Sequence, residues 1–438
     1  MKTYDLIVIG FGKAGKTLAA KFAKIGKKVA LIEQNPQMYG GTCINIGCIP
    51  TKTLINAAEK NLNFEQAMAD KTAVVGRLRN KNFENLDNLV DIIAGRAEFI
   101  EDKVIKVSAQ DDEIILTAEN IVINTGSEAV IPQIAGVKTT KNVFDSTEIQ
   151  NLDNLPDHLA IIGAGNIGLE FARLYNKLGS EVTIFETTDK ILPNDEPEVA
   201  DFAKKYLEDL GIKFKFNTNI SRISNDEAGK VLIDVDGEVI EFDSVLYAVG
   251  RKPRTSNLRL ENTNINLGDR GEILTNQYLE TSVEGVFAVG DVNGGPQFTY
   301  ISLDDYRIVA DYLLGNGQYS LSHRQSIPSV VFIDPPLARV GLTEKSAKDL
   351  GHNTISKSIP VAAMPRGHVN GDLRGIFKAV VDADTGLILG ANFLGESAHE
   401  LINLVAMAID NQIPGKNIAR QIFTHPTMAE NLNDLFDI

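Results

Sequence analysis

The chain contains two cysteines, Cys43 and Cys48, and both lie within residues 40–52. Five residues of regular helix would separate their Cα atoms by ~7.5 Å, which exceeds the reach of an unstrained disulfide. A bridge between them therefore requires a distorted turn, which Gly47 permits. Because strain makes a disulfide easier to reduce, the spacing favours a catalytic dithiol over a structural bridge.

A second candidate group lies near the C-terminus, where His425 precedes Pro426 and Glu430 follows shortly after. Proline disfavours helical geometry at the residue before it, and a carboxylate can orient an imidazole as a base. We expect Glu430 to orient His425. The alternative is that His425 is an ordinary surface histidine.

Two glycine-rich loops have the pattern of dinucleotide sites. Such a loop after a strand lets backbone amides approach a pyrophosphate at a helix N-terminus. An acid follows the third glycine of each loop at the same spacing and is expected to accept hydrogen bonds from a ribose. The first set is Gly10, Gly12, Gly15 and Glu33, and the second is Gly163, Gly165, Gly168 and Glu186.

A carboxylate at Glu186 would repel a 2′-phosphate, so the second site is expected to prefer NADH to NADPH. A glycine-rich turn and a solvated strand end are the alternatives for a single such loop. The repetition of both features at one spacing argues against them.

Strands and helices in the order of a βαβ unit surround each loop. Apolar residues 4–9 are typical of a strand buried on both faces, and a helix to residue 25 and a strand over 28–32 follow. The same order returns as a strand over 158–162, a helix over 169–178 and a strand over 181–185. Further strands are predicted at 113–117, 120–123, 243–249 and 285–289.

Beyond about residue 324 the pattern changes to antiparallel strands at 327–332, 377–382 and 387–394 and an amphipathic helix at 398–409. The predicted fold is α/β: two Rossmann-like dinucleotide-binding domains, for FAD and NAD, and an α+β C-terminal dimerisation domain. The expected boundaries are 1–148 and 253–325 for the two parts of the FAD domain, 149–252 for the NAD domain, and 326–438 for the dimerisation domain.

Composition excludes several other classes of protein. The chain has 438 residues, of which 43% are hydrophobic and 23% charged, so disorder and a disulfide-built mini-fold are ruled out. The net charge of −15 disfavours nucleic-acid and membrane partners. Two cysteines and six scattered histidines indicate no metal site. The N-terminus does not have the pattern of a signal peptide, so a cytoplasmic location is expected.

Together these segments resemble the class I flavoprotein disulfide reductases, the family of glutathione reductase, dihydrolipoamide dehydrogenase and mercuric reductase. The resemblance covers essentially the whole chain and includes the segment Gly-Gly-Thr-Cys-x4-Cys, Gly290-Asp291, and His-Pro-Thr-x-x-Glu at 425–430. It implies FAD on the first fingerprint, NAD(P)H on the second and a homodimer.

The resemblance also assigns roles to particular residues. It implies that Cys43 faces the substrate, that Cys48 lies beside the flavin, and that His425 acts on the cysteines of the other subunit. Lys52 and Glu170 match an ion pair near the flavin ring, with a surface lysine as the alternative for Lys52. Asp291 matches the acid that holds the ribityl chain. The other implied cofactor-binding positions are Thr42, Thr125, Gly126, Gly250 and Gly290.

Departures from the family pattern narrow the substrate. The chain has no additional cysteine pair, unlike mercuric reductase and the large thioredoxin reductases. Glu186 stands where NADPH-using glutathione reductases carry arginine, and Asn166 replaces a common aromatic residue. Residues 9–18, 38–43 and 294–305 resemble the bacterial reactive-chlorine-resistance flavoproteins, a branch that includes hypothiocyanous acid reductases and has been linked to copper(II) reduction.

The expected function is therefore an FAD-dependent enzyme that passes electrons from NADH through Cys43 and Cys48 to a small oxidant, hypothiocyanous acid above all. Reduction of Cu(II) or another metal ion and dihydrolipoamide dehydrogenase activity are the enzymatic alternatives. A flavoprotein redox sensor without catalytic activity is the alternative from another class.

Overall fold

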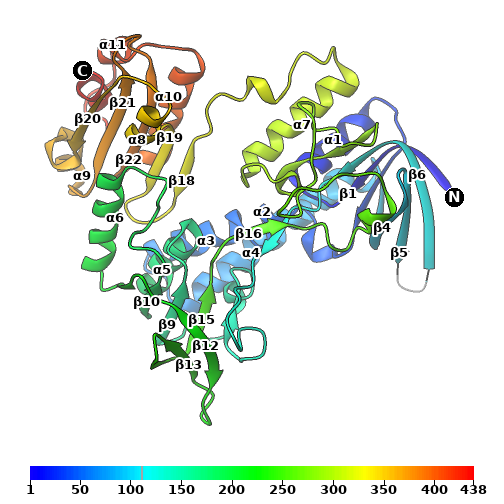
Figure 1. Ribbon diagram of the computed structural model, residues 1–438, viewed down its shortest axis with the longest axis horizontal. Coiled ribbons are helices and arrows are strands. Elements are labelled where there is room, and N and C mark those ends of the chain that lie inside the picture. Colours follow the sequence, from blue (N-terminus) through cyan, green and yellow to red (C-terminus); the bar gives the residue numbers. More distant parts are fainter. Residues whose placement is uncertain (110–111) are drawn as a thin grey trace. The chain divides into compact units, whose positions relative to one another are not determined.

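The computed structural model describes residues 1–109 and 112–438, and the chain divides into two compact units (Figure 1). The first unit comprises residues 1–131, 146–152 and 249–323. The second comprises residues 132–145, 153–248 and 324–438. The chain therefore passes several times between the units, and each unit is assembled from segments far apart in the sequence.

The first unit is built on a seven-stranded sheet. Strands β3, β2, β1 and β6 are parallel neighbours in that order, and β17 lies parallel to β6. Strand β5 pairs antiparallel with β6, and β4 pairs antiparallel with β5. The bounds are β1 Lys2–Ile9, β2 Val29–Glu33, β3 Asp91–Ala94, β4 Arg96–Glu101, β5 Val104–Ala109, β6 Asp112–Ile123 and β17 Val286–Ala288. Helices α1 (Lys13–Lys24) and α7 (Thr299–Leu314) contribute buried side chains to the core beside this sheet.

The prediction of two short strands at 113–117 and 120–123 is wrong, because β6 is one continuous strand. Its first half pairs antiparallel with β5, and its last three residues pair parallel with β17. On its other edge, β1 pairs with residues 116–123. The break expected in the middle is absent because β1 holds both halves in one ladder.

The remaining elements of the first unit include the two helices that carry the cysteines. A two-stranded antiparallel ribbon joins β7 to β16. The bounds are α2 Thr42–Asn45, α3 Cys48–Glu59, α4 Phe64–Asp87, β7 Ser127–Ala129 and β16 Arg251–Pro253.

The second unit repeats the parallel design in its first part. The strand order is β11, β10, β9, β15 and β8, and all neighbours are parallel. A three-stranded antiparallel sheet of β12, β13 and β14 accompanies it. The bounds are β8 Val143–Phe144, β9 His158–Ile162, α5 Asn166–Leu178, β10 Glu181–Phe185, α6 Pro197–Asp209, β11 Lys213–Lys215, β12 Ile220–Asn225, β13 Val231–Val235, β14 Glu238–Phe242 and β15 Ser244–Tyr247.

The C-terminal part of the second unit is a five-stranded antiparallel sheet in the order β18, β19, β22, β21 and β20. Helix α10 places its apolar face on the core of this sheet, as the sequence predicts. The bounds are β18 Ser329–Val331, β19 Leu337–Gly341, α8 Glu344–Asp349, β20 Thr354–Pro360, α9 Pro365–Asn370, β21 Ile376–Asp382, β22 Ile388–Leu394, α10 Ala398–Asp410, α11 Gly415–Ala419 and α12 Asn431–Leu435.

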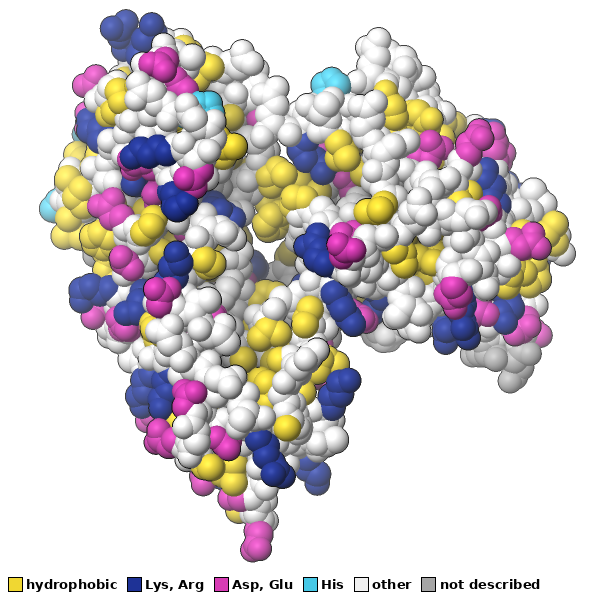
Figure 2. Space-filling model, viewed as in Figure 1, with side chains coloured by type: hydrophobic (Ala, Val, Ile, Leu, Met, Phe, Trp, Pro, Cys, Tyr) yellow, Lys and Arg dark blue, Asp and Glu magenta, His cyan; other side chains and the backbone are white. Residues whose placement is uncertain are grey.

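Acidic and basic side chains are interspersed on the face of the molecule in Figure 2. None of the helices among the described residues combines the length and the apolar character that a membrane span requires.

Candidate active site

The two cysteines lie on either side of a break between two helices. Cys43 belongs to the short helix α2, which ends at Asn45, and Cys48 is the first residue of α3. Gly47 forms the break. The distorted turn that the spacing requires is therefore present, and it allows the two thiols to form a hydrogen bond with each other.

The approach to this turn depends on close contact between backbones. Gly41 has a φ of +77°, and a Cβ atom there would lie 2.8 Å from the Cα of Gly12 in the first glycine loop. The cysteine segment thus rests directly on that loop. A side chain at position 41 would separate the two, which explains why glycine is required there.

The surroundings of Cys43 oppose its ionisation. The hydrogen bond with Cys48, burial and the nearby Cys48 sulfur raise the pKa of the Cys43 thiol, while the Thr299 hydroxyl and the Lys16 ammonium act to lower it. The Oγ1 of Thr299 also lies 3.8 Å from the Cys48 sulfur. Cys48 stands at the N-terminus of a 12-residue helix, where the helix dipole favours a thiolate.

Hydrogen bonds from polar side chains hold the backbone on the N-terminal side of Gly47 in place. The Nδ2 of Asn45 donates to the carbonyls of Tyr39 and Gly41 at 3.0 and 2.9 Å, and the Nε of Arg79 donates to the Asn45 Oδ1 at 2.8 Å. The Nε2 of Gln150 donates to the Ile46 carbonyl at 3.1 Å. Sequence reasoning missed these residues, since none belongs to a recognised chemical motif.

The first glycine loop packs around Asn124, another residue that sequence reasoning missed. A Cβ at Gly10 or Gly12 would lie 2.5 Å from an oxygen of Asn124. The amide of Gly15 donates to the Asn124 Oδ1 at 2.9 Å, and the Asn124 Nδ2 donates to the Val289 carbonyl at 2.9 Å. Asn124 therefore joins the loop to strands β6 and β17.

Glu33 closes the same loop from the end of β2. Its carboxylate accepts hydrogen bonds from the amides of Phe11 at 3.1 Å and Asn35 at 3.0 Å. Burial raises the pKa of the Glu33 carboxyl, and these amide hydrogen bonds oppose the rise. The acid thus lies beside the glycine loop, as its predicted role requires.

The other predicted FAD-binding positions lie in the first unit. The Asp291 Oδ2 accepts from the Ser127 Oγ at 2.6 Å, and the amide of Gly290 donates to the buried Asp305 at 2.7 Å. The Thr125 hydroxyl donates to the Arg254 carbonyl at 2.7 Å. A Cβ at Gly126 would lie 3.8 Å from the Thr42 hydroxyl, which brings these two positions together.

The second glycine loop repeats the first in the second unit. A Cβ at Gly168 would lie 2.0 Å from the Gly163 carbonyl, so only glycine fits, whereas Gly165 faces open space. The carboxylate of Glu186 accepts from the amides of Ala164 at 2.9 Å and Thr188 at 3.0 Å. Burial acts to raise the pKa of the Glu186 carboxyl, but the hydrogen bonds have the larger effect. The pKa of Glu186 is therefore lowered.

The last two positions linked to the NAD site lie in different units, Gly250 in the first and Asn166 in the second. Gly250 has a φ of +119°, a conformation that favours glycine, and its carbonyl accepts from the Val130 amide at 3.0 Å. Asn166 is the first residue of α5.

The predicted base and its orienting acid are in contact. The Nδ1 of His425 lies 2.7 Å from the Glu430 Oε2, and the His425 side chain is 71% exposed. Glu170, on α5, accepts a hydrogen bond from the Phe332 amide at 2.9 Å. Lys52 lies on α3 in the other unit, so its ion pair with Glu170 remains a prediction.

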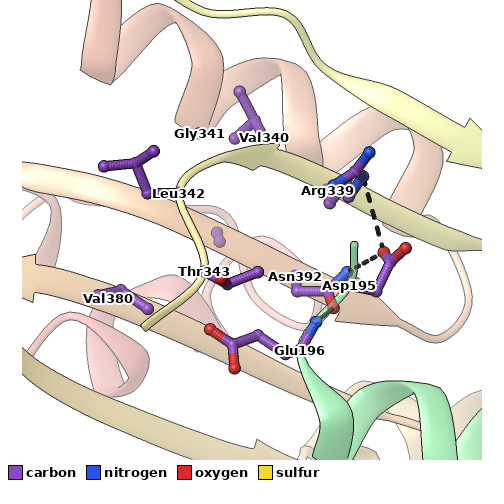
Figure 3. A pocket seen from close by; sticks show the side chains of 10 residues that line it. Asp195, Glu196, Arg339, Val340, Gly341, Leu342, Thr343, Val380 and Asn392 are labelled. Atoms are coloured by element: carbon purple, nitrogen blue, oxygen red, sulfur yellow. Dashed lines mark hydrogen bonds and ion pairs between the residues drawn. The ribbon is translucent and has the colours of Figure 1, made fainter. Parts of the chain in front are cut away.

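A small pocket in the second unit is lined by a buried polar network (Figure 3). The Asn392 Nδ2 donates to Asp195 at 3.2 Å, and Arg339 lies 3.8 Å from the same carboxylate. The Glu196 amide donates to Asn392, and its carboxylate pairs with Lys378 at 3.1 Å. These groups join the segment before α6 to the C-terminal sheet and satisfy one another. Within the described residues no group of three or more His, Cys, Asp or Glu is arranged to hold a metal ion.

The chain contains two sheets built on parallel strands, each with a glycine loop of the dinucleotide-binding type. It also contains a turn that carries two thiols and a C-terminal domain with an antiparallel sheet. This combination defines a flavoprotein disulfide reductase. The family model of pyridine nucleotide-disulphide oxidoreductases matches residues 4–305, and the dimerisation domain of these enzymes matches residues 327–436. The chain belongs to this family, and the predicted fold class is confirmed.

The chain is 47% identical to the probable pyridine nucleotide-disulfide oxidoreductase RclA of Escherichia coli (strain K12), with 100% of each chain covered. It is 34% identical to a mercuric reductase of Staphylococcus aureus, over 98% of this chain and 81% of that protein. Among solved structures, the Cu(II) complex of HOCl-induced flavoprotein disulfide reductase RclA from Escherichia coli superimposes with a TM-score of 0.97 at 46% identity, covering 100% of this chain and 99% of that one.

Family membership confirms that the chain is an oxidoreductase whose cofactors are FAD and NAD(P)H. This result favours an enzyme over a redox sensor without catalytic activity. The presence of the dimerisation domain supports a homodimer.

Proposed function

We propose that this enzyme oxidises NADH and reduces hypothiocyanous acid through the Cys43–Cys48 pair. The observation that carries the proposal is the hydrogen-bonded pair of thiols at the break between α2 and α3. The name of the related HOCl-induced reductase supports a role with reactive halogen oxidants. A small sulfenyl electrophile needs a thiolate and a proton, and it needs no large recognition surface.

Two groups of residues would hold the cofactors. Gly10, Gly12 and Gly15 with Glu33 would bind FAD, together with Thr42, Thr125, Gly126, Gly290 and Asp291. Gly163, Gly165, Gly168, Glu186 and Gly250 would bind NADH. The open space at Gly165 fits a pyrophosphate in the second loop, and each loop leads into a helix N-terminus, which favours an anion. When bound, NADH and FAD supply the electron pair that reduces the disulfide.

The dithiol would carry the chemistry on the substrate. The Cys43 thiolate attacks the sulfur of hypothiocyanous acid, a sulfur–sulfur bond forms, and the sulfur–oxygen bond breaks. Cys48 then attacks the Cys43 sulfur, releases thiocyanate and forms the disulfide. His425 of the partner subunit, oriented by Glu430, would hold and return the proton that leaves Cys43. Lys52 and Glu170 would form the ion pair near the flavin.

The test is steady-state NADH oxidation by the purified enzyme with hypothiocyanous acid, lipoamide, oxidised glutathione and Cu(II). We expect the highest kcat/KM with hypothiocyanous acid, and no turnover with it after Cys43→Ser or Cys48→Ser. Faster turnover of lipoamide would instead establish a dihydrolipoamide dehydrogenase.

Reduction of Cu(II) is a second candidate function, because the related reductase has been solved as a Cu(II) complex. The same panel separates the two candidates. Turnover of Cu(II) that survives Cys43→Ser would show a route that does not use the dithiol.

A further inference from the structure

Lys16 extends from α1 toward the segment that carries Cys43. Its Nζ lies 3.5 Å from the carbonyl of Gly40 and donates a hydrogen bond to the Oδ1 of Asn82, on α4. The side chain is half-buried. Two neutral acceptors on two different elements therefore hold the amine close to the residues that lead into α2.

The amine and the Cys43 thiol act on each other electrostatically. Burial lowers the pKa of Lys16 to about 8, with a contribution from Lys13, while Cys43 acts to raise it. The Lys16 ammonium in turn acts to lower the pKa of Cys43. A lysine with a pKa near neutrality can both bear a positive charge and release a proton under the working conditions of an enzyme.

Among the contacts that the structure describes for Lys16, the neighbouring elements contribute no carboxylate that would neutralise its ammonium charge. On its own helix the titratable neighbour is Lys13, and on α2 it is Cys43. From α4, Asn82 offers a neutral amide, while the guanidinium of Arg79 is bound by Asn45 and Gln37.

We propose that Lys16 is a further catalytic residue, whose ammonium group stabilises the Cys43 thiolate and donates a proton to the oxygen that leaves the oxidant. This inference rests on the proposed function. It assigns a positively charged catalytic group, Lys16, that acts on the Cys43 thiol of its own subunit. His425, by contrast, is expected to act from the partner subunit on the proton that leaves Cys43.

The proposed step is balanced. The Cys43 thiolate and hypothiocyanous acid give a sulfenyl thiocyanate on Cys43 and hydroxide, and the Lys16 ammonium protonates the hydroxide to water. The neutral amine then takes a proton from solvent. The Cys48 thiolate displaces thiocyanate, and two electrons from NADH reduce the disulfide in the next cycle. The net reaction consumes NADH and hypothiocyanous acid and yields NAD⁺, thiocyanate and water, because the proton that Cys43 gives up equals the proton that the Lys16 amine takes up.

The experiment compares Lys16→Met, Lys16→Arg and Lys21→Met in the FAD-loaded dimer. Lys21 is exposed on the same helix, so Lys21→Met controls for the loss of one charge. The first readout is the alkylation rate of Cys43 against pH in NADH-reduced protein, followed by mass spectrometry. The second is kcat/KM for hypothiocyanous acid. Ferricyanide reduction, which bypasses the dithiol, reports on folding and on the flavin.

We expect Lys16→Met to raise the apparent pKa of Cys43 by about one unit and to lower kcat/KM for hypothiocyanous acid by ~10²-fold, with ferricyanide reduction unchanged. Lys16→Arg keeps the charge but cannot release a proton near neutrality. It should therefore restore the Cys43 alkylation profile while turnover stays low.

Wild-type behaviour of Lys16→Met in both readouts would overturn the inference, and full turnover by Lys16→Arg would remove the proton-donor role. If the wild-type enzyme does not consume hypothiocyanous acid, the proposed function fails. In that case an unchanged alkylation profile in Lys16→Met would still overturn the role of Lys16, and a shifted profile would support its role in stabilising the thiolate.

Discussion

The backbone amide of Ala164 donates a hydrogen bond to the carboxylate of Glu186 at 2.9 Å. The amide of Phe11 does the same to Glu33 at 3.1 Å. In each case the donor is the residue after the first glycine of the loop. The acceptor Glu33 is the last residue of β2, and the acceptor Glu186 directly follows β10. Each acid is therefore fixed beside its loop, and the negative charge of Glu186 lies where a ribose is expected.

Removing that charge should weaken the discrimination against NADPH. We predict that Glu186→Gln, which keeps an acceptor for Ala164, raises kcat/KM for NADPH relative to NADH by ~10-fold, or ~1.4 kcal/mol. Steady-state kinetics with ferricyanide as acceptor measures the ratio. Thr188→Val, which removes a hydroxyl bound to Glu186 but keeps the charge, is the control. Equal efficiencies of NADH and NADPH in the wild type would contradict the prediction.

The two thiols should be spectroscopically distinct. Cys48 begins α3, whose dipole favours its thiolate, and it is expected to lie beside the flavin. Reduced Cys43→Ser should therefore show a thiolate-to-flavin charge-transfer absorbance band, and Cys48→Ser should lack it. The opposite pattern would mean that the roles of the two cysteines are reversed.

The hydroxyl of Thr299 should support ionisation of Cys43, since its hydrogen bond acts to lower the pKa of that thiol. Thr299→Val removes the hydroxyl and keeps the shape, so the apparent pKa of Cys43 should rise. Thr299→Ser keeps the hydroxyl and should behave like the wild type. The pH dependence of Cys43 alkylation distinguishes the variants, and a wild-type profile in Thr299→Val would exclude this role.

The contribution of His425 from the partner subunit can be tested with mixed dimers. His425→Ala alone should slow the reduction of hypothiocyanous acid by ~10²–10⁴. A heterodimer of a Cys43→Ser subunit and a His425→Ala subunit holds one complete site if the histidine acts across the dimer, and none if it acts within its own subunit. Recovery of about half of the wild-type activity is expected, and its absence would place both groups in one chain.

The Glu344 carboxyl should make the stability of the folded protein depend on pH in the acidic range. Hydrogen bonds from Lys348, Ser356 and Lys378 lower the pKa of this carboxyl from 4.5 to about 2. A depressed carboxyl pKa contributes stability above pH 4.5 that is lost as the pH falls toward 2. Glu344→Gln should therefore lower Tm at pH 7, and the difference from wild type should shrink near pH 2. Glu238→Gln, at an exposed position, should leave Tm unchanged at both pH values.

The parts of the fold that follow local patterns could be predicted. A buried strand, a glycine loop and an acid at fixed spacing specify β1, α1 and β2, and again β9, α5 and β10. The spacing of the cysteines also predicted the break at Gly47. The roles of the individual site residues and the domain boundaries at 148, 252 and 325 stay predictions.

Residues that act through contacts between distant segments could not be predicted. Asn124 bonds Gly15, 109 positions earlier in the chain, and Thr299 contacts Cys48 across 251 positions. No short pattern contains both members of such a pair. The one available signal was a polar asparagine directly after the apolar end of β6. Lys16 was hidden for a different reason, because a lysine on a helix is usually solvated.

The pairing of β17 with β6 has a consequence for synthesis of the chain on the ribosome. Residues 121–123 of β6 emerge long before their partners at 286–288. At ~5–20 residues per second the interval is ~10–30 s. During that time the nascent first unit carries an apolar strand edge that its own sequence cannot yet cover, and such edges template aggregation. Biogenesis of this enzyme should therefore depend on chaperones that bind the emerging chain until the distant strand arrives.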